Sequence, residues 1–275
     1  MNPIRIKLGT GFTHTSLSTS RDYILEMPDT EKIGGTWIDG GHNVVLIGGS
    51  ITIPTGTRPG VEYDSERNGI YISKSTGTVH IEGVSINGIG GAEFDGIDIA
   101  APLATVQLEN LRITEVRGTF SHFHADVVQT WGGVKDLRID DLTGTSNYQG
   151  LTLEEDLGPM GSAQISNVDL TATTEPPLDK GGHMLWLTPD SNSCSSYPVS
   201  LSNVYVTPRP NLTLGTSVWP PDNSSLSCGE SGATFATWPT LPVTGGVQEG
   251  APPNGSFVPP GIAGVGYVSP GYSES

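Results

Sequence analysis

VHIEGVSI, residues 79–86, is the first of five similar phrases in this chain. The other four are VQLENLRI (106–113), LRIDDLT (137–143), AQISNVDL (163–170) and VSLSNVYV (199–206). Aligned on their central apolar residue, they give one column at successive steps of 27, 31, 26 and 36: Ile81, Leu108, Ile139, Ile165 and Leu201. Self-similarity with a period of roughly 20–50 residues is typical of solenoids, in which each repeat packs on its neighbours.

A second set of short phrases runs in phase with the first. It consists of GIYI (69–72), DGIDI (95–99), DVVQT (126–130), QGLTL (149–153) and HMLWL (183–187). A weaker copy of the first phrase, VLIGGSI (45–51), is expected to place Ile47 in the column of Ile81, 34 residues earlier. Two short strands per period, with no helical pattern between them, predict an all-β chain coiled as a parallel solenoid.

Apolar and polar residues alternate within each phrase, as in Val79 and Ile81 against His80 and Glu82. This alternation directs one set of side chains inward and the other outward. Stacked parallel strands lie about 4.8 Å apart, so residues in one column become neighbours in space although they are far apart in sequence. An asparagine recurs at the turn inside three phrases, a position that favours residues tolerant of a left-handed backbone. These residues are Asn110, Asn167 and Asn203.

The composition excludes some partners. The chain has 13 lysines and arginines against 29 aspartates and glutamates, for a formal net charge of −16. Nucleic acids and anionic membranes both attract lysine and arginine, so we expect neither as a partner. No apolar run approaches the length of a membrane-spanning helix. Residues 1–16 lack the apolar core of a secretory signal, which indicates either a removed signal or release by another route.

Three regions are expected. Residues 1–35 should form an N-terminal cap, because an open solenoid end exposes unpaired backbone. Residues 36–207 carry the phrases and should form the solenoid body. Residues 208–275 are rich in proline and glycine, which predicts an extended irregular arm packed on the solenoid or on a partner, with a disordered linker as the alternative. We expect Cys194 and Cys228 to form a disulfide, the alternative being two free thiols.

The second set of phrases brings acidic residues together. Asp95 and Asp126 fall in one column. Asp98 falls in a second column, in the next outward position, together with Tyr71, Gln129, Thr152 and Trp186. Carboxylates this close cannot all ionise freely, so one pKa should rise, which supplies an acid and a base for cleaving a glycosidic bond. His124 lies beside them as a fourth candidate catalytic residue. The alternatives are glycan binding without turnover, and acids that only bond turn backbone or hold a calcium ion between coils; no other metal or cofactor is expected.

Candidate sugar-binding residues flank these acids. Aromatic faces pack against the C–H surfaces of pyranose rings, so Tyr71, Trp131 and Trp186 are candidate stacking platforms. Their alternative role is ordinary burial beneath the C-terminal arm. The polar candidates for contact with the glycan are Gln129, Gln149 and Glu154.

Residues 36–207 resemble the right-handed parallel β-helix of the pectate-lyase-like superfamily. Within them, FDGIDI (94–99) looks like the NTDGIDI motif of polygalacturonase-type glycoside hydrolases, and ADVVQT (125–130) stands where that family has its Asp-Asp pair. The resemblance implies that Asp95 and Asp126 match two of the family's three catalytic aspartates.

Several positions depart from the family pattern. Ala125 replaces one aspartate of the pair, Gln149 replaces the histidine of a Gly-His-Gly motif, and MLWL (184–187) replaces the Arg-Ile-Lys that grips a substrate carboxylate. The superfamily's lyases use a basic residue together with cations. The cations near these phrases are scattered over different faces: Lys74, Lys135 and Arg138. We therefore expect the architecture to carry over, and neither of the two familiar mechanisms.

These observations favour a virion-associated protein of the phage tail-spike type that recognises a host cell-surface polysaccharide, with or without cleaving it. Its partners would be that polysaccharide, other virion proteins and further copies of the chain in a homotrimer, and it would act outside the cell or on the virion surface. One alternative is a secreted glycoside hydrolase or polysaccharide lyase whose active site is the acid cluster. Another is a non-catalytic structural or decoration protein.

Overall fold

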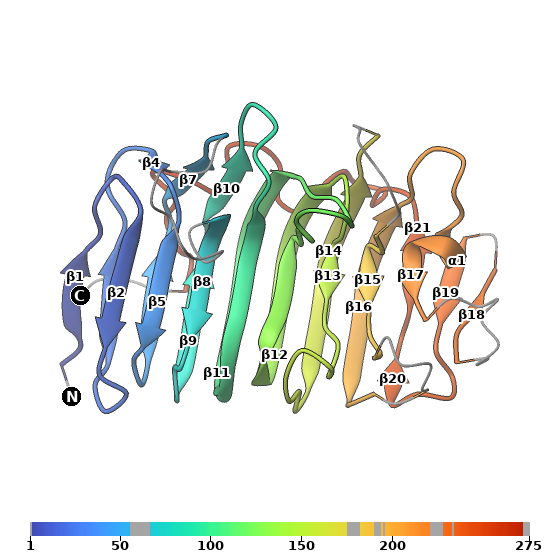
Figure 1. The fold of residues 1–275 in the computed structure, drawn as a ribbon, viewed down its shortest axis with the longest axis horizontal. Coiled ribbons are helices and arrows are strands. Elements are labelled where there is room, and N and C mark those ends of the chain that lie inside the picture. The colour runs from blue at the N-terminus through green and yellow to red at the C-terminus, as the bar shows by residue number, and fades with distance from the viewer. Residues whose placement is uncertain are drawn as a thin grey trace.

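The computed structural model describes residues 2–55, 67–174, 182–189, 194, 196–220, 228–232 and 234–271. It is all-β, and hydrogen bonds join its strands into one large, mostly parallel sheet. Figure 1 shows the strands side by side along the long axis, from blue at the N-terminal end to orange at the other end. One short helix, α1 (Leu214–Ser217), lies near that second end.

The strands fall into three rows, in which each strand pairs in parallel with its counterpart in the next repeat. Row A contains β2 (Thr13–Leu17), β5 (Thr36–Gly40), β8 (Asn68–Ser73), β13 (Leu151–Thr152), β15 (Leu185–Trp186) and β17 (Val218–Trp219). Row B contains β1 (Ile4–Lys7), β3 (Tyr23–Glu26), β6 (Val44–Ile47), β9 (Thr78–Glu82) and β20 (Val243–Thr244). Row C contains β4 (Lys32–Ile33), β7 (Ser50–Ile53), β10 (Ser85–Gly88) and β21 (Val247–Glu249).

Four long strands connect these rows. β11 (Asp95–Val116) and β12 (Val128–Ser146) take part in all three rows. Their mutual register shifts between Asp98 and Thr105, where β11 passes from row A to row B, and again after Ile113. β14 (Ala163–Ala172) and β16 (Val199–Thr207) take part in rows B and C. At the far end, β18 (Glu230–Ser231) pairs antiparallel with β19 (Phe235–Thr237). β19 also pairs antiparallel with β21.

The inward column predicted from the five phrases is confirmed in row B, where these residues pair in register: Ile81, Leu108, Ile139, Ile165 and Leu201. The expectation for Ile47 is wrong, because Leu46 pairs with Ile81 instead. Leu46 is fully buried and Ile47 is half-buried. Since side chains alternate between faces, a slip of one residue exchanges the inward and outward sets, and burial of leucine selects the observed register.

The inward residues of all three rows form one hydrophobic cluster. In row A, for example, Ile38, Ile70 and Ile97 are fully buried on successive strands. Burying a side chain of this size contributes roughly 1.5–3 kcal/mol. The polar residues between them are therefore held on the outer surface of each row.

The turns inside the phrases have the left-handed backbone predicted for asparagine. The φ angle is 53° at Asn110 and Asn167 and 54° at Asn203. Asp141 takes the same position in its phrase with a φ of 54°, and Gly83 does so with a φ of 68°. The side chains also join repeats, since Asn203 Nδ2 donates to Asn167 Oδ1 at 3.0 Å.

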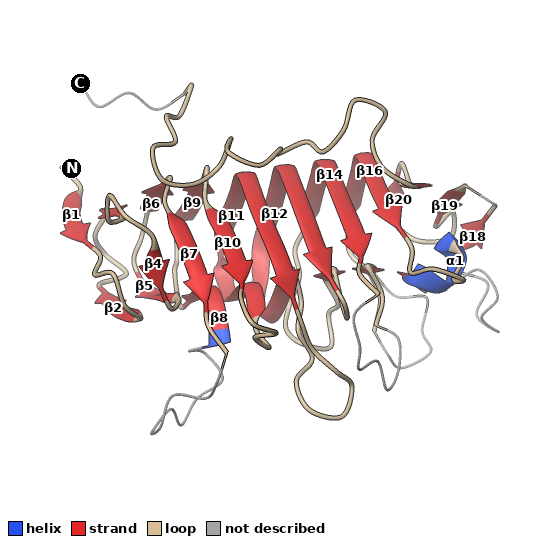
Figure 2. Cartoon of the chain, turned by 90° about the horizontal axis from the view of Figure 1, so that it is seen from above, coloured by secondary structure: helices blue, strands red, loops and turns tan. Residues whose placement is uncertain are grey.

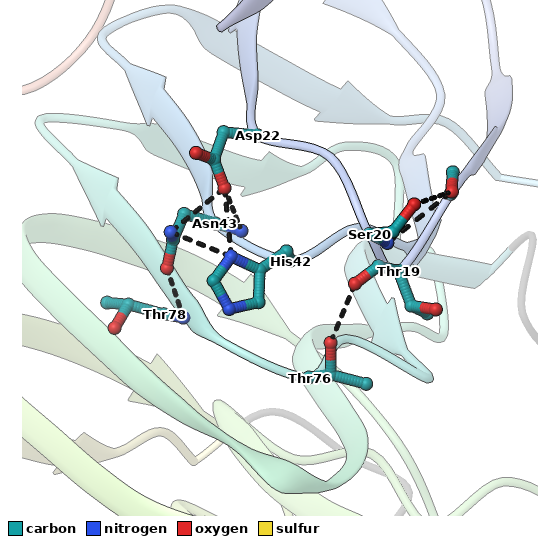
Figure 3. Close-up of polar contacts among 8 residues, drawn as sticks. Thr19, Ser20, Asp22, His42, Asn43, Thr76 and Thr78 are labelled. Carbon is teal, nitrogen blue, oxygen red and sulfur yellow. Dashed lines mark hydrogen bonds and ion pairs between the residues drawn. The ribbon is translucent and has the colours of Figure 1, made fainter. Parts of the chain in front are cut away.

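A second set of turns, between rows A and B, is fastened by side chains from successive repeats (Figure 3). Asp22 Oδ1 accepts hydrogen bonds from His42 Nδ1 at 3.0 Å and from Asn43 Nδ2 at 2.9 Å. Asn43 Oδ1 accepts the backbone N–H of Thr78 at 2.9 Å. The hydrogen bond from His42 holds the pKa of Asp22 below its usual range. Three successive repeats are thereby connected at one corner.

The paired rows extend beyond residues 36–207 in both directions. β1, β2 and β3 pair in parallel with strands of the following repeat, in the region expected to be a cap. β20 and β21 pair in parallel with β16, in the region expected to be an irregular arm. These added strands have two to five residues each, which is too short for the repeated phrase to be visible in the sequence.

Residues 250–271, here called the C-terminal strap, run back along the rows towards the β1 end (Figure 2). The strap bonds to outward side chains of successive row C strands. These bonds run from Phe257 N to Asp169 Oδ1 (2.9 Å), from Val258 N to Thr143 Oγ1 (2.9 Å), from Arg112 Nη1 to Val258 O (2.9 Å) and from Val265 N to Ser50 Oγ (3.0 Å). The strap therefore lies across row C.

Cys194 and Cys228 form a disulfide, with their Cα atoms 5.6 Å apart and their positions 34 apart in sequence. We expect the C194A/C228A double variant to lose about 4 kcal/mol of unfolding free energy, because the cross-link restricts the unfolded chain. Urea unfolding of the variant and the wild type measures this difference. A difference below about 1 kcal/mol would contradict the expected contribution.

Candidate functional site

A single outward column runs along row A and collects aromatic and polar side chains. Its members pair in register from one repeat to the next: His14, Trp37, Tyr71, Asp98, Gln129, Thr152, Trp186 and Trp219. The segment from Tyr71 to Trp186 is the column predicted from the aligned phrases. At about 4.8 Å per repeat, the column from Trp37 to Trp219 spans about 29 Å. It presents aromatic rings towards both ends and a carboxyl group between them.

A pocket of about 510 Å³ opens over the N-terminal half of this column. Its lining contains Trp37, Asn68, Tyr71, Asp95, Asp98, His122, Phe123, His124, Gln129 and Trp131. Six of the candidate residues from the sequence are thus brought together. The contacts of the C-terminal strap described above are on row C, whereas the pocket is on row A, so they do not cover it.

Asp98 is the central acidic group of the pocket. It lies on β11, it is 8% exposed, and its Oδ2 accepts a hydrogen bond from Asn68 Nδ2 at 3.2 Å. Burial raises the pKa of Asp98 to about 7, although hydrogen bonds from the Trp131 backbone and from Asn68 act in the opposite direction. A carboxyl group with this pKa is protonated in a large fraction of molecules near neutral pH, so it can donate a proton to a bound ligand.

Asp95 and Asp126 lie in the same part of row A but have different surroundings. Asp95 lines the pocket, and its Oδ1 accepts the backbone N–H of Asp126 at 2.8 Å. Asp126 is fully buried, accepts a hydrogen bond from the Thr152 hydroxyl, and is not part of the pocket lining. Burial and the nearby charges of Asp98 and Glu154 raise its pKa well above the usual range. Asp126 therefore lies behind the pocket, where its ionisation is disfavoured and a ligand in the pocket does not reach it.

The loop formed by residues 117–127, between β11 and β12, supplies one wall of the pocket. His124 donates from Nε2 to the backbone oxygen of Phe120 at 2.7 Å and stacks on the Phe120 ring. His122 Nδ1 lies 2.5 Å from Glu93 Oε2. The guanidinium group of Arg67 lies 5.0 Å from the centre of the Phe123 ring. His124 is therefore positioned by its own loop on the wall of the pocket.

Aromatic rings form the floor and rim at the N-terminal side of the pocket. Trp37 stacks on His14, with ring centres 3.9 Å apart and planes 7° apart, and its centre lies 5.3 Å from that of Tyr71. Trp131 is 55% exposed, which leaves its ring open to a ligand. Burial and the charge of Asp98 raise the pKa of Tyr71, so its hydroxyl remains a neutral hydrogen-bonding group.

The other candidate residues lie outside the pocket lining. Gln149 and Glu154 are buried. Trp186 lies further along the row A column, where its ring packs at 5.0 Å from His183 and 5.6 Å from Trp219. Burial lowers the pKa of His183 to about 4, so this imidazole is neutral at physiological pH. Trp186, Trp219 and His183 form a second aromatic group on the same row.

Three residues of the column were missed in the sequence reasoning: His14, Trp37 and Trp219. The spacing of 34 residues that identified the weak copy at Ile47 also leads from Tyr71 back to Trp37, so the signal for this residue was present. Trp219 follows Trp186 by 33 residues, beyond the last clear phrase of the second set. Extending the second set of phrases by one period in each direction would have found both tryptophans.

The charges of the pocket lining limit its chemistry. Among the residues that the structure describes, no lysine or arginine lines the pocket. Arg67 lies against the ring of Phe123 and pairs with Glu93 at 3.9 Å, and Lys74 forms an ion pair with Asp39 at 2.9 Å. The described lining therefore offers no lysine or arginine to a uronate carboxylate, whereas it offers carboxyl, amide and phenol partners to neutral hydroxyl groups.

The fold and this site define an all-β protein with a large, mostly parallel sheet and an acidic pocket lined by aromatic rings. Comparisons with protein-family models, with curated proteins and with solved structures find no match for this chain. Within the described ranges, no helix has both the length and the apolar character needed to cross a membrane.

Proposed function

We propose that the chain is a right-handed parallel β-helix that binds an extended, uncharged polysaccharide along row A and hydrolyses it in the pocket. The three parallel rows and the resemblance of residues 94–99 to a glycoside hydrolase motif support this architecture. The single observation that carries the activity is Asp98, a buried carboxyl group with a pKa of about 7 among aromatic rings.

In the proposed reaction, the protonated Asp98 carboxyl donates its proton to the glycosidic oxygen as the bond from that oxygen to the anomeric carbon breaks. A water molecule attacks the anomeric carbon, and Asp95, the second carboxylate of the pocket, accepts the proton that this water releases. The products are two shorter glycans, and the proton on Asp95 returns to solvent while Asp98 is reprotonated. Asp126 is fully buried outside the pocket lining and carries no step of this reaction.

The proposed substrate class follows from the lining of the pocket and column. Trp37, Tyr71 and Trp131 offer faces for pyranose rings, while Gln129 and Asn68 offer amide groups to sugar hydroxyls. The lack of lysine and arginine in the lining disfavours uronic acid polymers. We therefore expect a neutral glycan or one containing N-acetylated amino sugars.

We expect the D98N variant to lose hydrolysis by about 100-fold or more and to keep its affinity, because asparagine preserves the shape of the side chain but cannot donate an acidic proton. The assay is the release of reducing ends from a panel of neutral glucans, chitin oligosaccharides and host cell-wall glycan, with polygalacturonate as the anionic comparison. Affinity electrophoresis in the same glycans measures binding.

The matched control is D29N, which changes an exposed aspartate outside the pocket and should retain full activity. Binding by the wild type without release of reducing ends would remove the catalytic part of the proposal and leave a glycan-binding protein. Neither binding nor release from any member of the panel would overturn the proposal as a whole.

The biological setting expected from the sequence stays a prediction. Association with virions is checked by co-purification of the chain with particles, and the homotrimer is checked by sedimentation. A chain that is found only free in the medium would favour the secreted hydrolase over the virion protein.

A further inference from the structure

Three side chains that can ligate a metal converge on the outward face of row B, away from the pocket. His80 and Glu82 lie two residues apart on β9, and Glu109 of β11 pairs with Glu82 in register. One ligand atom from each side chain lies within 4.8 Å of the other two. One nitrogen and two carboxylate oxygens at these separations can bind a single ion together.

Hydrogen bonds orient the His80 ring so that Nε2 points towards Glu82. His80 Nδ1 lies 3.2 Å from Gln107 Oε1, an atom that can only accept a hydrogen bond. A hydrogen bond donated from Nδ1 to this oxygen would leave Nε2 as the metal-binding nitrogen. Nε2 lies 3.1 Å from Glu82 Oε2, and an ion bound between them would replace the direct hydrogen bond of Nε2 to this carboxylate. A histidine that binds a metal through one ring nitrogen usually donates a hydrogen bond from the other, which fixes the orientation of the ring.

Glu82 is fixed in place by the C-terminal strap. It is 4% exposed, Tyr267 donates its hydroxyl proton to Oε1 at 2.6 Å, and Ser269 Oγ donates to Oε2 at 2.8 Å. A carboxylate oxygen can accept a hydrogen bond and still offer a lone pair to an ion. An ion bound here would therefore join row B to the strap.

Negative charge gathers around these three residues. Asp140 pairs in register with Glu109, and Asp141 follows it. In the described part of the chain, neither Glu82 nor Glu109 forms an ion pair with a lysine or arginine. A divalent cation would offset the repulsion among these carboxylates.

We propose that His80, Glu82 and Glu109 form a divalent-cation site that fastens the C-terminal strap to row B. Imidazole with two carboxylates suits Zn²⁺, whereas Ca²⁺ takes six or more oxygen ligands. The site is separate from the pocket, and the proposal does not depend on glycan binding.

The test is a calorimetric titration of untagged, EDTA-treated and dialysed protein with ZnCl₂ at neutral pH, followed by the same titration with CaCl₂. We expect one equivalent of Zn²⁺ to bind, and its affinity to fall by about 10-fold or more in the E109Q and H80Q variants. E115Q is the matched control, because Glu115 lies on the same strand β11 but is exposed and pairs with Arg117. Its Zn²⁺ affinity should be unchanged.

Other outcomes would overturn the proposal. If Zn²⁺ does not saturate, or if it binds E109Q and H80Q as tightly as the wild type, no site exists at these residues. If Ca²⁺ binds tightly and H80Q leaves that binding unchanged, His80 is not a ligand and the zinc assignment is wrong. Circular dichroism of each variant before titration confirms that the fold is retained, and Zn²⁺ should raise the thermal midpoint of the wild type and of E115Q only.

Discussion

When the pH is raised from about 4 to about 9, the wild type is expected to lose about 4 kcal/mol more of its unfolding free energy than the D98N variant loses. Burial raises the pKa of Asp98 to about 7 in the folded chain, while in the unfolded chain it returns to the usual value near 4. The folded state therefore holds this proton more tightly than the unfolded state does. The stabilising contribution is fully present below the unfolded pKa and is lost as the pH rises through the folded value.

This prediction compares two pH profiles, so groups that titrate in both proteins cancel. Urea unfolding at several pH values, for the wild type, D98N and the exposed control D29N, measures the profiles. D29N should follow the wild type, and D98N should be flatter, with the largest difference above pH 7. If D98N follows the wild-type profile, Asp98 does not have a raised pKa and cannot be the proton donor of the proposed reaction.

The G150A variant is expected to lose about 3 kcal/mol or more of unfolding free energy. Gly150 lies at the start of the QGLTL phrase, where its N–H donates to His183 O at 3.0 Å in the next repeat. A Cβ atom at this position would lie 2.2 Å from Met184 O and 2.9 Å from the carbon of that carbonyl. Because both contacts are with backbone, no side chain can move aside, and the two repeats must separate.

Gly11 provides the control for this substitution. A Cβ atom added there meets no atom within 4 Å, so G11A should change the free energy of unfolding only slightly. The midpoints of thermal and urea unfolding give both values. Equal stability of G150A and G11A would mean that the repeats at Gly150 are spaced more widely than the structure shows.

The fold was predictable in its main features because repetition makes the core visible in the sequence. Five phrases with the same alternation specify which residues point inward, and row B follows them. The register was predicted wrongly by one residue at Leu46 and Ile47, in the weakest copy of the phrase. Two glycines follow there, so neither the alternation of apolar residues nor the turn specified which residue points inward. The outer repeats, with strands of two to five residues, offered no alternation long enough to recognise.

The sequence predicted which residues of the candidate site align from repeat to repeat, but not which of them are exposed to a ligand. Register placed Tyr71, Asp98 and Gln129 together, and the structure brings them into one pocket. The sequence does not say how deep each acid lies. Asp126 follows Asp95 in the stack and is nevertheless fully buried, with its carboxylate hydrogen-bonded to Thr152. Depth depends on loops such as residues 117–127, whose path no periodicity describes.

The C-terminal strap has a consequence for the order in which the chain folds. Neighbouring repeats are joined by contacts between residues about 20 to 40 positions apart, so the rows can grow from a local nucleus, one repeat at a time. The bonds of the strap to Ser50 and Glu82 join residues 215 and 185 positions apart. Closing loops of that length is slow and gains nothing until the rows exist to receive the strap. The strap is therefore expected to dock only after the rows that receive it have formed.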